Sequence, residues 1–343
     1  MKRVDRAVLL LASALLCGRL NADIAWQVRP GPDNIVHVSE AFESVALSLS
    51  ASADLEVRLR ASEDGIHWSE WTMASIDDDL TDRSEGRYLT AITHFGSAMR
   101  HLEISASQPL TRVTATMFPP HEPRRRVVAA SLAIGQLTAR SRSDWGCPDG
   151  QAAPLWTPAY TTVTHAVVHH TAGSNSVPDW EAEVRSIWYF HTYSNGWGDI
   201  GYNYLIDPNG VIYEGRAGGP GAIGAHFSCR NTNTAGIALL GTFTSELPSA
   251  AALDSLKRLL AELCAMNRIE PAAFAFHVPS ALNVPTIIGH RDGNSSPLTC
   301  SRTECPGSAL YALLPAVRSD VAALRASMPS RRRAVRRQDS ARQ

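Results

Sequence analysis

Histidine and cysteine side chains in the second half of this chain have the chemistry of a metal site. His169 ends an apolar, β-branched run that begins at Val163, so a strand is expected to place its imidazole at the rim of a sheet. His290 follows a second short apolar run, and Cys305 lies in the loop sequence after it. Two imidazoles, one thiolate and an open fourth position suit a catalytic zinc ion, whereas a structural zinc ion takes four protein ligands. The residue types therefore indicate a catalytic zinc site.

The cysteines leave more than one choice for the sulfur ligand. Cys300 lies in the segment 293–302, between His290 and Cys305, so it competes with Cys305. Apart from Cys17, which falls in an N-terminal apolar run, the chain has five cysteines: Cys147, Cys229, Cys264, Cys300 and Cys305. Because five is odd, at least one is expected to have a role other than a disulfide in an oxidising compartment. If Cys305 is the metal ligand, the remaining four cysteines allow three pairings, and the sequence leaves the choice among them open.

Helices and strands alternate from residue 141 to residue 328, which predicts an α/β domain over this range. An apolar stripe from Trp180 to His191 predicts one helix, with Ser176 or Asp179 as its N-cap. Leucine repeats predict two further helices, at 253–263 and 310–324. Apolar runs predict strands at 163–169, 202–206, 211–213 and 236–240.

The first half of the chain alternates apolar and polar residues in short runs, with turn residues between them and no long helical period. This pattern predicts a smaller antiparallel β-sandwich over residues 24–118. The Pro- and Arg-rich segment 119–140 is interpreted as a linker. Trp68 and Trp71 lie around a turn, where exposed rings would stack on sugars. The favoured interpretation places one ring in the core and the other over a strand edge.

The two ends of the chain predict export and a basic tail. Three basic residues precede an apolar run at 7–17, and small residues follow, as in a signal peptide over residues 1–22. The apolar run is too short to span a bilayer, so no membrane span is expected. The arginine-rich segment 329–343 has no apolar period and is expected to be disordered. A net charge of −1 gives no reason to expect a nucleic-acid partner.

Four ordered motifs stand in the predicted α/β domain. They are Val-Val-His-His-Thr-Ala at 167–172, Gly-Trp-Gly-Asp-Ile-Gly-Tyr at 196–202, Gly-Ala-His at 224–226, and Gly-His-Arg-Asp at 289–292 followed by Thr-Glu-Cys-Pro-Gly at 303–307. In these motifs the chain resembles the type 2 N-acetylmuramoyl-L-alanine amidase family, which includes the peptidoglycan recognition proteins. The resemblance covers residues 141 to about 324 and implies a mixed β-sheet flanked by helices, with zinc in a groove.

The resemblance implies the ligands of that zinc ion. His169 and His290 carry over as the two imidazole ligands, and Cys305 carries over as the thiolate. Cys305 is preferred to Cys300 because Pro-Gly follows it, as in the family. Cys300 is then expected to form a disulfide that stiffens its loop. His170 faces the opposite side of its strand and is interpreted as a packing residue.

The implied reaction is hydrolysis of the amide bond between N-acetylmuramic acid and L-alanine in peptidoglycan. Zinc lowers the pKa of its bound water and polarises the carbonyl. Tyr202 carries over as the residue that positions this water or stabilises charge on the carbonyl oxygen, and Thr303 assists by hydrogen bonding. The alternative is a recognition protein that binds peptidoglycan without cutting it, and family members of that kind typically lose the cysteine ligand.

Three further residues are candidate substrate contacts. Gly196 and Trp197 match a pair that accompanies binding of diaminopimelate-type stem peptides in recognition proteins, although the pair could equally serve the fold. His226 is interpreted either as a substrate contact or as a structural hydrogen-bonding residue. With the export signal, the resemblance implies a secreted protein, periplasmic or extracellular, whose partner is the cell wall.

Overall fold

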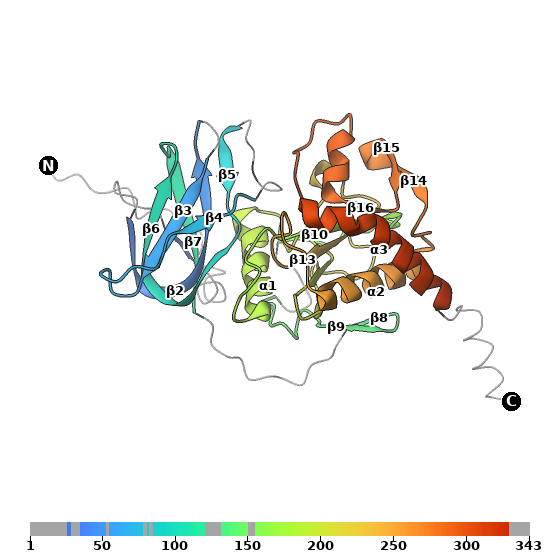
Figure 1. Cartoon of the computed structure of the whole chain (residues 1–343), viewed down its shortest axis with the longest axis horizontal. Helices are drawn as coiled ribbons and strands as arrows, with labels where there is room; N and C mark the ends of the chain where they lie inside the picture. Colours follow the sequence, from blue (N-terminus) through green and yellow to red (C-terminus); the bar gives the residue numbers. More distant parts are fainter. Residues whose placement is uncertain are drawn as a thin grey trace. The chain divides into compact units, whose positions relative to one another are not determined.

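The computed structural model describes residues 26–28, 35–52, 55–77, 81, 85–120, 132–149 and 155–328 (Figure 1). They form two compact units. The first unit takes the described residues within Met1–Val128, Arg142–Trp156 and Ala172–Ile200, and the second takes those within Ala129–Ser141, Thr157–Thr171 and Gly201–Gln343. The predicted signal peptide and the predicted basic tail lie outside the described residues. Among the residues that are described, no helix has the length and apolarity to cross a membrane.

The first unit contains a seven-stranded sheet whose neighbouring strands are antiparallel, in the order β1-β7-β2-β6-β3-β4 with β5 on β2. The strands are β1 (Trp26–Val28), β2 (Ile35–Ser50), β3 (Val57–Ser62), β4 (Thr72–Ala74), β5 (Arg87–Leu89), β6 (Thr93–Ala106) and β7 (Arg112–Phe118). The long strand β2 pairs with β6 and with β7, and its register against β6 shifts between His37 and Ser44. Antiparallel pairing is confirmed, while the division into two sandwich layers stays a prediction.

One face of this sheet forms the core of the first unit. Leu59 and Ala61 of β3 and Leu102 and Ile104 of β6 are buried, as strand alternation requires. Trp68 and Trp71 belong to the other face. Trp68 is half-buried and Trp71 is exposed, and neither joins the buried cluster. The interpretation of one tryptophan as a core residue is therefore wrong.

Helix α1 (Trp180–Tyr189) also belongs to the first unit and continues into the π-helical turn η3 (Phe190–Ser194). Asp179 is the N-cap of the helix, and its carboxylate accepts hydrogen bonds from the backbone N–H groups of Glu181 and Ala182. Such a cap satisfies N–H groups that have no partner within the helix. Of the two predicted caps, the structure selects Asp179.

The second unit is built on a mixed five-stranded sheet in the order β12-β11-β13-β10-β16, in which β12 is antiparallel and the other pairs are parallel. This agrees with the mixed sheet that the resemblance implied. The strands are β10 (His165–His170), β11 (Tyr204–Ile206), β12 (Ile212–Glu214), β13 (Thr234–Leu239) and β16 (Ile287–Gly289), with the separate hairpins β8 (Leu132–Ile134)–β9 (Leu137–Ala139) and β14 (Phe274–His277)–β15 (Leu282–Pro285).

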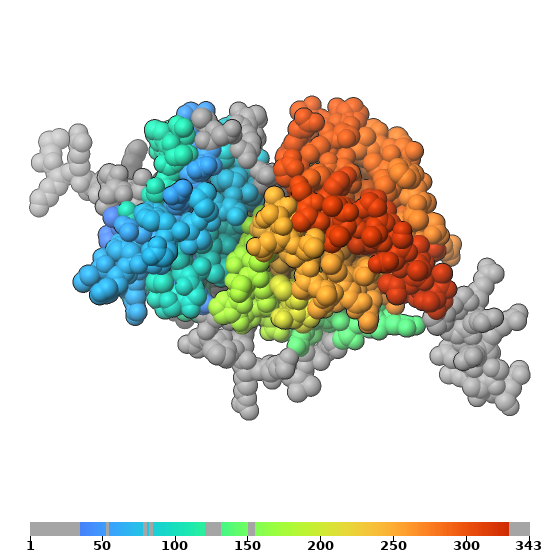
Figure 2. Space-filling model, in the orientation of Figure 1, coloured from blue at the N-terminus to red at the C-terminus, as the bar shows by residue number. Residues whose placement is uncertain are grey.

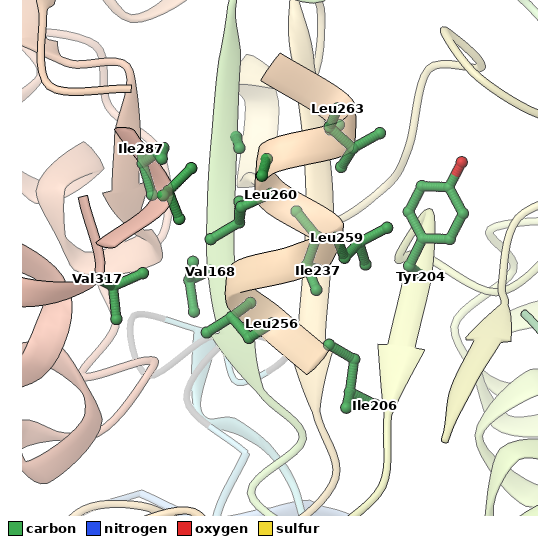
Figure 3. Packing of buried hydrophobic residues seen from close by; sticks show 14 of the residues in the cluster. Val168, Tyr204, Ile206, Ile237, Leu256, Leu259, Leu260, Leu263, Ile287 and Val317 are labelled. Carbon is green, nitrogen blue, oxygen red and sulfur yellow. The ribbon is translucent and has the colours of Figure 1, made fainter. Parts of the chain in front are cut away.

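Two long helices, α2 (Ala250–Asn267) and α3 (Ser308–Ser327), cover one face of that sheet. The leucines of α2 pack against Val168 of β10 and Ile237 of β13 (Figure 3). Each fully buried leucine, isoleucine or valine stabilises the fold by about 1.5–3 kcal/mol. The outer surfaces of α2 and α3 adjoin (Figure 2), and Lys257 pairs with Asp320 between them at 3.2 Å.

Alternation along β10 decides which histidine faces which side. Val168 packs under α2, whereas Val167 lies in a separate cluster on the opposite face. His169 therefore shares the face of Val167, away from the two helices. His170 points back toward the helical side, where its Nδ1 accepts the N–H of Phe243 at 3.2 Å. The interpretation of His170 as a packing residue agrees with this position.

Candidate metal centre

The three predicted ligands meet in the second unit. His169 lies near the end of β10, and His290 follows β16 directly; the two strands are parallel neighbours, so both imidazoles leave the sheet at the same edge. Cys305 reaches them from a loop after the 3-10 helix η6 (His290–Ser295). One potential ligand atom from each side chain lies within 4.8 Å of the others, and all three residues are buried. Sequence segments that are far apart thus converge on one point.

The loop that carries Cys305 is tied to η6. The backbone N–H of Cys305 donates to Oγ1 of Thr303 at 2.9 Å, and its carbonyl accepts the N–H of Arg291 at 2.8 Å. The side-chain amide of Asn294 bonds both backbone groups of Thr303, at 2.8 and 3.1 Å. The thiol sulfur then lies 3.5 Å from Nδ1 of His169. Thr303 is buried and helps to fix the backbone beside the sulfur.

Cys300, the rival ligand, forms a disulfide with Cys229. Cys229 lies in the 3-10 helix η4 (Ser228–Arg230), so the crosslink joins that turn to the loop before Cys305. The two other cysteines, Cys147 and Cys264, are buried free thiols. Burial raises the pKa of Cys264 to about 12, which keeps this thiol neutral. Cys305 is therefore the only described cysteine beside the two histidines.

His226 supplies a hydrogen-bond partner for His169 that the sequence did not reveal. Nδ1 of His226 lies 3.0 Å from Nε2 of His169. The backbone N–H of His226 donates to Oδ1 of Asn231 at 2.7 Å, and its ring packs against Gly236, where a Cβ would come within 2.4 Å. Residue 236 must therefore lack a side chain. His226 is buried, and its role as a substrate contact stays a prediction.

Two aromatic rings enclose the histidines. The ring of Tyr202 lies 5.2 Å from that of His169, between centroids, and is buried. The ring of Phe227 lies 5.5 Å from that of His290, whose Nε2 is 3.4 Å from Oγ of Ser228. Tyr202 is thus adjacent to a predicted ligand, and its catalytic role stays a prediction.

Gly196 and Trp197 lie in the first unit, after η3. The ring of Trp197 packs at 4.7 Å against that of His191, which is buried. Gly196 has φ of +70° and open space where a side chain would extend. Their role in substrate binding stays a prediction.

The donor set fits zinc. Two imidazole nitrogens and one thiolate are ligands that zinc takes in catalytic sites, which leave one position for water or substrate. Calcium and magnesium prefer oxygen donors, and none of the three side chains offers one. The hydrogen bond between His169 and His226 supplies the second partner that a ligating histidine normally has.

Comparison with known proteins places this site in a matched region. The family described as N-acetylmuramoyl-L-alanine amidase matches residues 159–308, which include all three candidate ligands. Peptidoglycan-recognition protein LB of Drosophila melanogaster is 35% identical over 188 residues, 53% of this chain and 71% of that protein. An N-acetylmuramoyl-L-alanine amidase of Sus scrofa is 32% identical over 185 residues, 53% of this chain and 27% of that protein.

A solved structure of peptidoglycan recognition protein LE in complex with tracheal cytotoxin is 31% identical to the part of the chain that it covers. The matched region is 52% of this chain and 92% of the chain in that structure, with a TM-score of 0.42. The family match begins at residue 159, so it leaves out the seven-stranded sheet of the first unit.

Proposed function

Because the chain belongs to the family of N-acetylmuramoyl-L-alanine amidases and peptidoglycan-recognition proteins, we propose that it hydrolyses the amide bond between N-acetylmuramic acid and L-alanine in peptidoglycan. The observation that carries this proposal is the convergence of His169, His290 and Cys305. These three side chains leave a fourth position for water or substrate, as the ligands of catalytic zinc sites do. Retention of Cys305 beside the two histidines favours the enzyme over a recognition protein.

His169, His290 and Cys305 would hold the zinc ion. When bound, zinc supplies Lewis-acid chemistry and lowers the pKa of water toward neutrality. The hydrogen bond to His226 would fix the tautomer of His169: with Nδ1 facing Cys305, the proton stays on Nε2 and is donated to Nδ1 of His226. Burial of these side chains lowers the local dielectric constant and so strengthens the electrostatic interactions among them.

Tyr202 and Thr303 would support the reaction in different ways. Tyr202 lies beside His169, and its hydroxyl is proposed to donate to the carbonyl oxygen as negative charge develops there. Thr303 accepts the N–H of Cys305, so it is proposed to hold the sulfur in place. Neither side chain carries a charge at neutral pH, so their contribution would come from directed hydrogen bonds.

The proposed setting is outside the cytoplasm, as a secreted protein in the periplasm or the extracellular space. The N-terminal signal pattern supports export, and the Cys229–Cys300 disulfide suits an oxidising compartment. The partner would be the peptidoglycan strand with its stem peptide. The pair Gly196 and Trp197 supports a diaminopimelate-type stem peptide as the proposed preference.

Digestion of purified sacculi tests the reaction. The wild-type chain should release intact stem peptides with a free L-alanine amino group, detected by mass spectrometry, and leave glycan strands without peptides. A chelator should abolish this release, and added zinc should restore it. Tight binding of sacculi without any release of peptides would contradict the proposal and favour a recognition protein.

A further inference from the structure

Flat side chains form a row across the solvent side of the sheet in the first unit. His37 of β2 faces His101 of β6 across the strand pair, and Arg60 of β3 follows on the next strand. Trp68 forms an antiparallel bridge with Ser62 at the end of β3, and Trp71 lies just before the edge strand β4. We refer to these five residues as the aromatic row. It crosses the neighbouring strands β2, β6 and β3, which lie about 4.8 Å apart, and ends beside β4.

Contacts hold the members of the aromatic row together. The guanidinium carbon of Arg60 lies 5.0 Å from the ring centroid of Trp68 and 4.7 Å from that of Trp71. The ring of His101 meets that of Trp68 edge-on at 6.5 Å, and its Nδ1 lies 2.6 Å from Nδ1 of His37. One cation thus joins both indoles, an arrangement that orients the rings without burying them.

The turn before Trp68 is also fixed. The carboxylate of Asp64 accepts the backbone N–H groups of Ile66 and His67, both at 2.8 Å, and the hydroxyl of Ser62. Gly65 has φ of +76°, and a Cβ there would lie 3.3 Å from the ring of His101. Glycine therefore lets the turn approach the aromatic row closely. The position of the indole is determined before any ligand arrives.

Exposure of the two tryptophans in the aromatic row is unusual for this residue type. Trp71 is 38% exposed, and Trp68 is half-buried, although tryptophan is highly buried on average. The cation in the row has a counter-charge, because Arg60 donates to Oε2 of Glu103 at 2.6 Å. The row therefore offers apolar ring faces, hydrogen-bonding groups and a locally balanced charge. Such a surface complements a neutral, hydroxylated polymer better than a polyanion.

We propose that the aromatic row is a second binding site, which takes the glycan strand of the cell wall. The C–H faces of pyranose rings would stack on the indoles of Trp68 and Trp71. Arg60 and Glu103 would bond ring hydroxyls and acetamido groups. The identity of this glycan rests on the proposed function, because the same polymer carries the amide bond that the second unit would cut.

Binding of bare glycan oligomers tests this inference on the full chain. The probe is soluble β-1,4-linked oligomers of N-acetylglucosamine, which present the pyranose faces and acetamido groups of the glycan strand but carry neither a stem peptide nor a lactyl carboxylate. These oligomers contain no bond for the amidase to cut, so their binding does not depend on catalysis. Titration calorimetry should show saturable binding to the wild-type chain. Trp71→Ala should weaken it at least about tenfold, and Trp71→Phe should weaken it less.

Ile66→Ala is the matched control, since Ile66 lies in the same turn and is 76% exposed but has no ring. Its affinity for the oligomers should equal that of the wild type. Absence of oligomer binding by the wild-type chain, or equal affinity of Trp71→Ala and wild type, overturns the inference. Preferential, salt-sensitive binding of a phosphate-rich wall polymer overturns it as well. Peptide release from sacculi by the wild type decides the proposed function separately, so the two failures are distinguishable.

Discussion

Nε2 of His169 lies 3.0 Å from Nδ1 of His226, and the two residues are 57 positions apart in the sequence. The second nitrogen of the proposed first ligand is therefore bonded to a buried imidazole rather than to solvent. Outer partners of this kind orient a ligand and raise its basicity. His226 should therefore affect metal affinity without binding the metal.

Replacement of His226 should weaken zinc binding. His226→Ala removes the partner of His169, and the affinity for zinc should fall about 10- to 100-fold. His226→Asn keeps a hydrogen-bonding group and should retain more of the affinity. Competition with a chelator of known affinity measures the effect. Equal affinities of His226→Ala and wild type would show that the His169–His226 contact does not support the site.

Replacement of Cys305 should remove both metal and activity. The wild-type chain should hold about one zinc ion, and Cys305→Ala should lose it, with peptide release reduced on the order of 100-fold or more. Cys264→Ala is the control, because Cys264 is a buried free thiol outside the site. Metal analysis and peptide release are measured on the same preparations. Loss of zinc from both variants alike would mean that the cysteine position has no special role.

The Cys229–Cys300 disulfide should stabilise the fold without serving the metal. The crosslinked residues are 71 positions apart, and a disulfide typically stabilises a fold by about 2–4 kcal/mol, with the larger values for long loops such as this one. The double variant Cys229→Ser/Cys300→Ser should lose about this free energy of unfolding in urea and still bind zinc. A reductant should lower the stability of the wild type and leave that of the double variant unchanged. If the double variant bound no zinc, Cys300 would again be a candidate for the sulfur ligand.

A histidine–carboxylate pair in the first unit should make stability depend on pH. Nε2 of His94 lies 2.6 Å from Oε2 of Glu183; the side chain of Glu183 is buried, and that of His94 is 10% exposed. Burial is the largest influence and lowers the pKa of His94, but the charge of Glu183, its hydrogen bond and the charge of Glu43 together raise this pKa above 6.5. The folded state then binds the proton more tightly than the unfolded state. The contribution is complete below pH 6.5 and is lost as pH rises through the raised pKa.

His94→Gln tests this pair. At about pH 6 the variant should have a free energy of unfolding about 1–3 kcal/mol below that of the wild type, and the difference should shrink at about pH 9. His67→Gln is the control, because His67 is 87% exposed beside its carboxylate partner and should change little at either pH. A His94→Gln difference that stays constant from pH 6 to pH 9 would show that protonation of His94 does not matter.

The sequence predicted the regular elements of the second unit well. The run 163–169 became β10 (His165–His170), and the leucine repeats at 253–263 and 310–324 lie within α2 and α3. These elements have strong apolar periods, which are local properties of the chain. The hairpins β8–β9 and β14–β15 were missed, because two short paired segments depend on contacts that a local pattern does not record.

Less of the candidate site could be predicted from the residue types alone. The types of His169, His290 and Cys305 indicated zinc, but the choice of Cys305 over Cys300 came from the resemblance. The contact between His169 and His226 follows from packing of His226 on Gly236, which no spacing expresses. The error at Trp68 and Trp71 has a similar origin: hydrophobicity favours burial, whereas Arg60 holds both rings at the surface.

The disulfide between Cys229 and Cys300 affects what happens when a protease cleaves the chain between these two residues. A single cut between residues 230 and 299 would leave two pieces of chain, one with His169 and the other with Cys305. The sulfur–sulfur bond would keep these pieces covalently attached beside the converging side chains. In denaturing gel electrophoresis, the cleaved chain would therefore migrate as one species without reductant and as two species with it. A chain without this disulfide would separate into two pieces under both conditions.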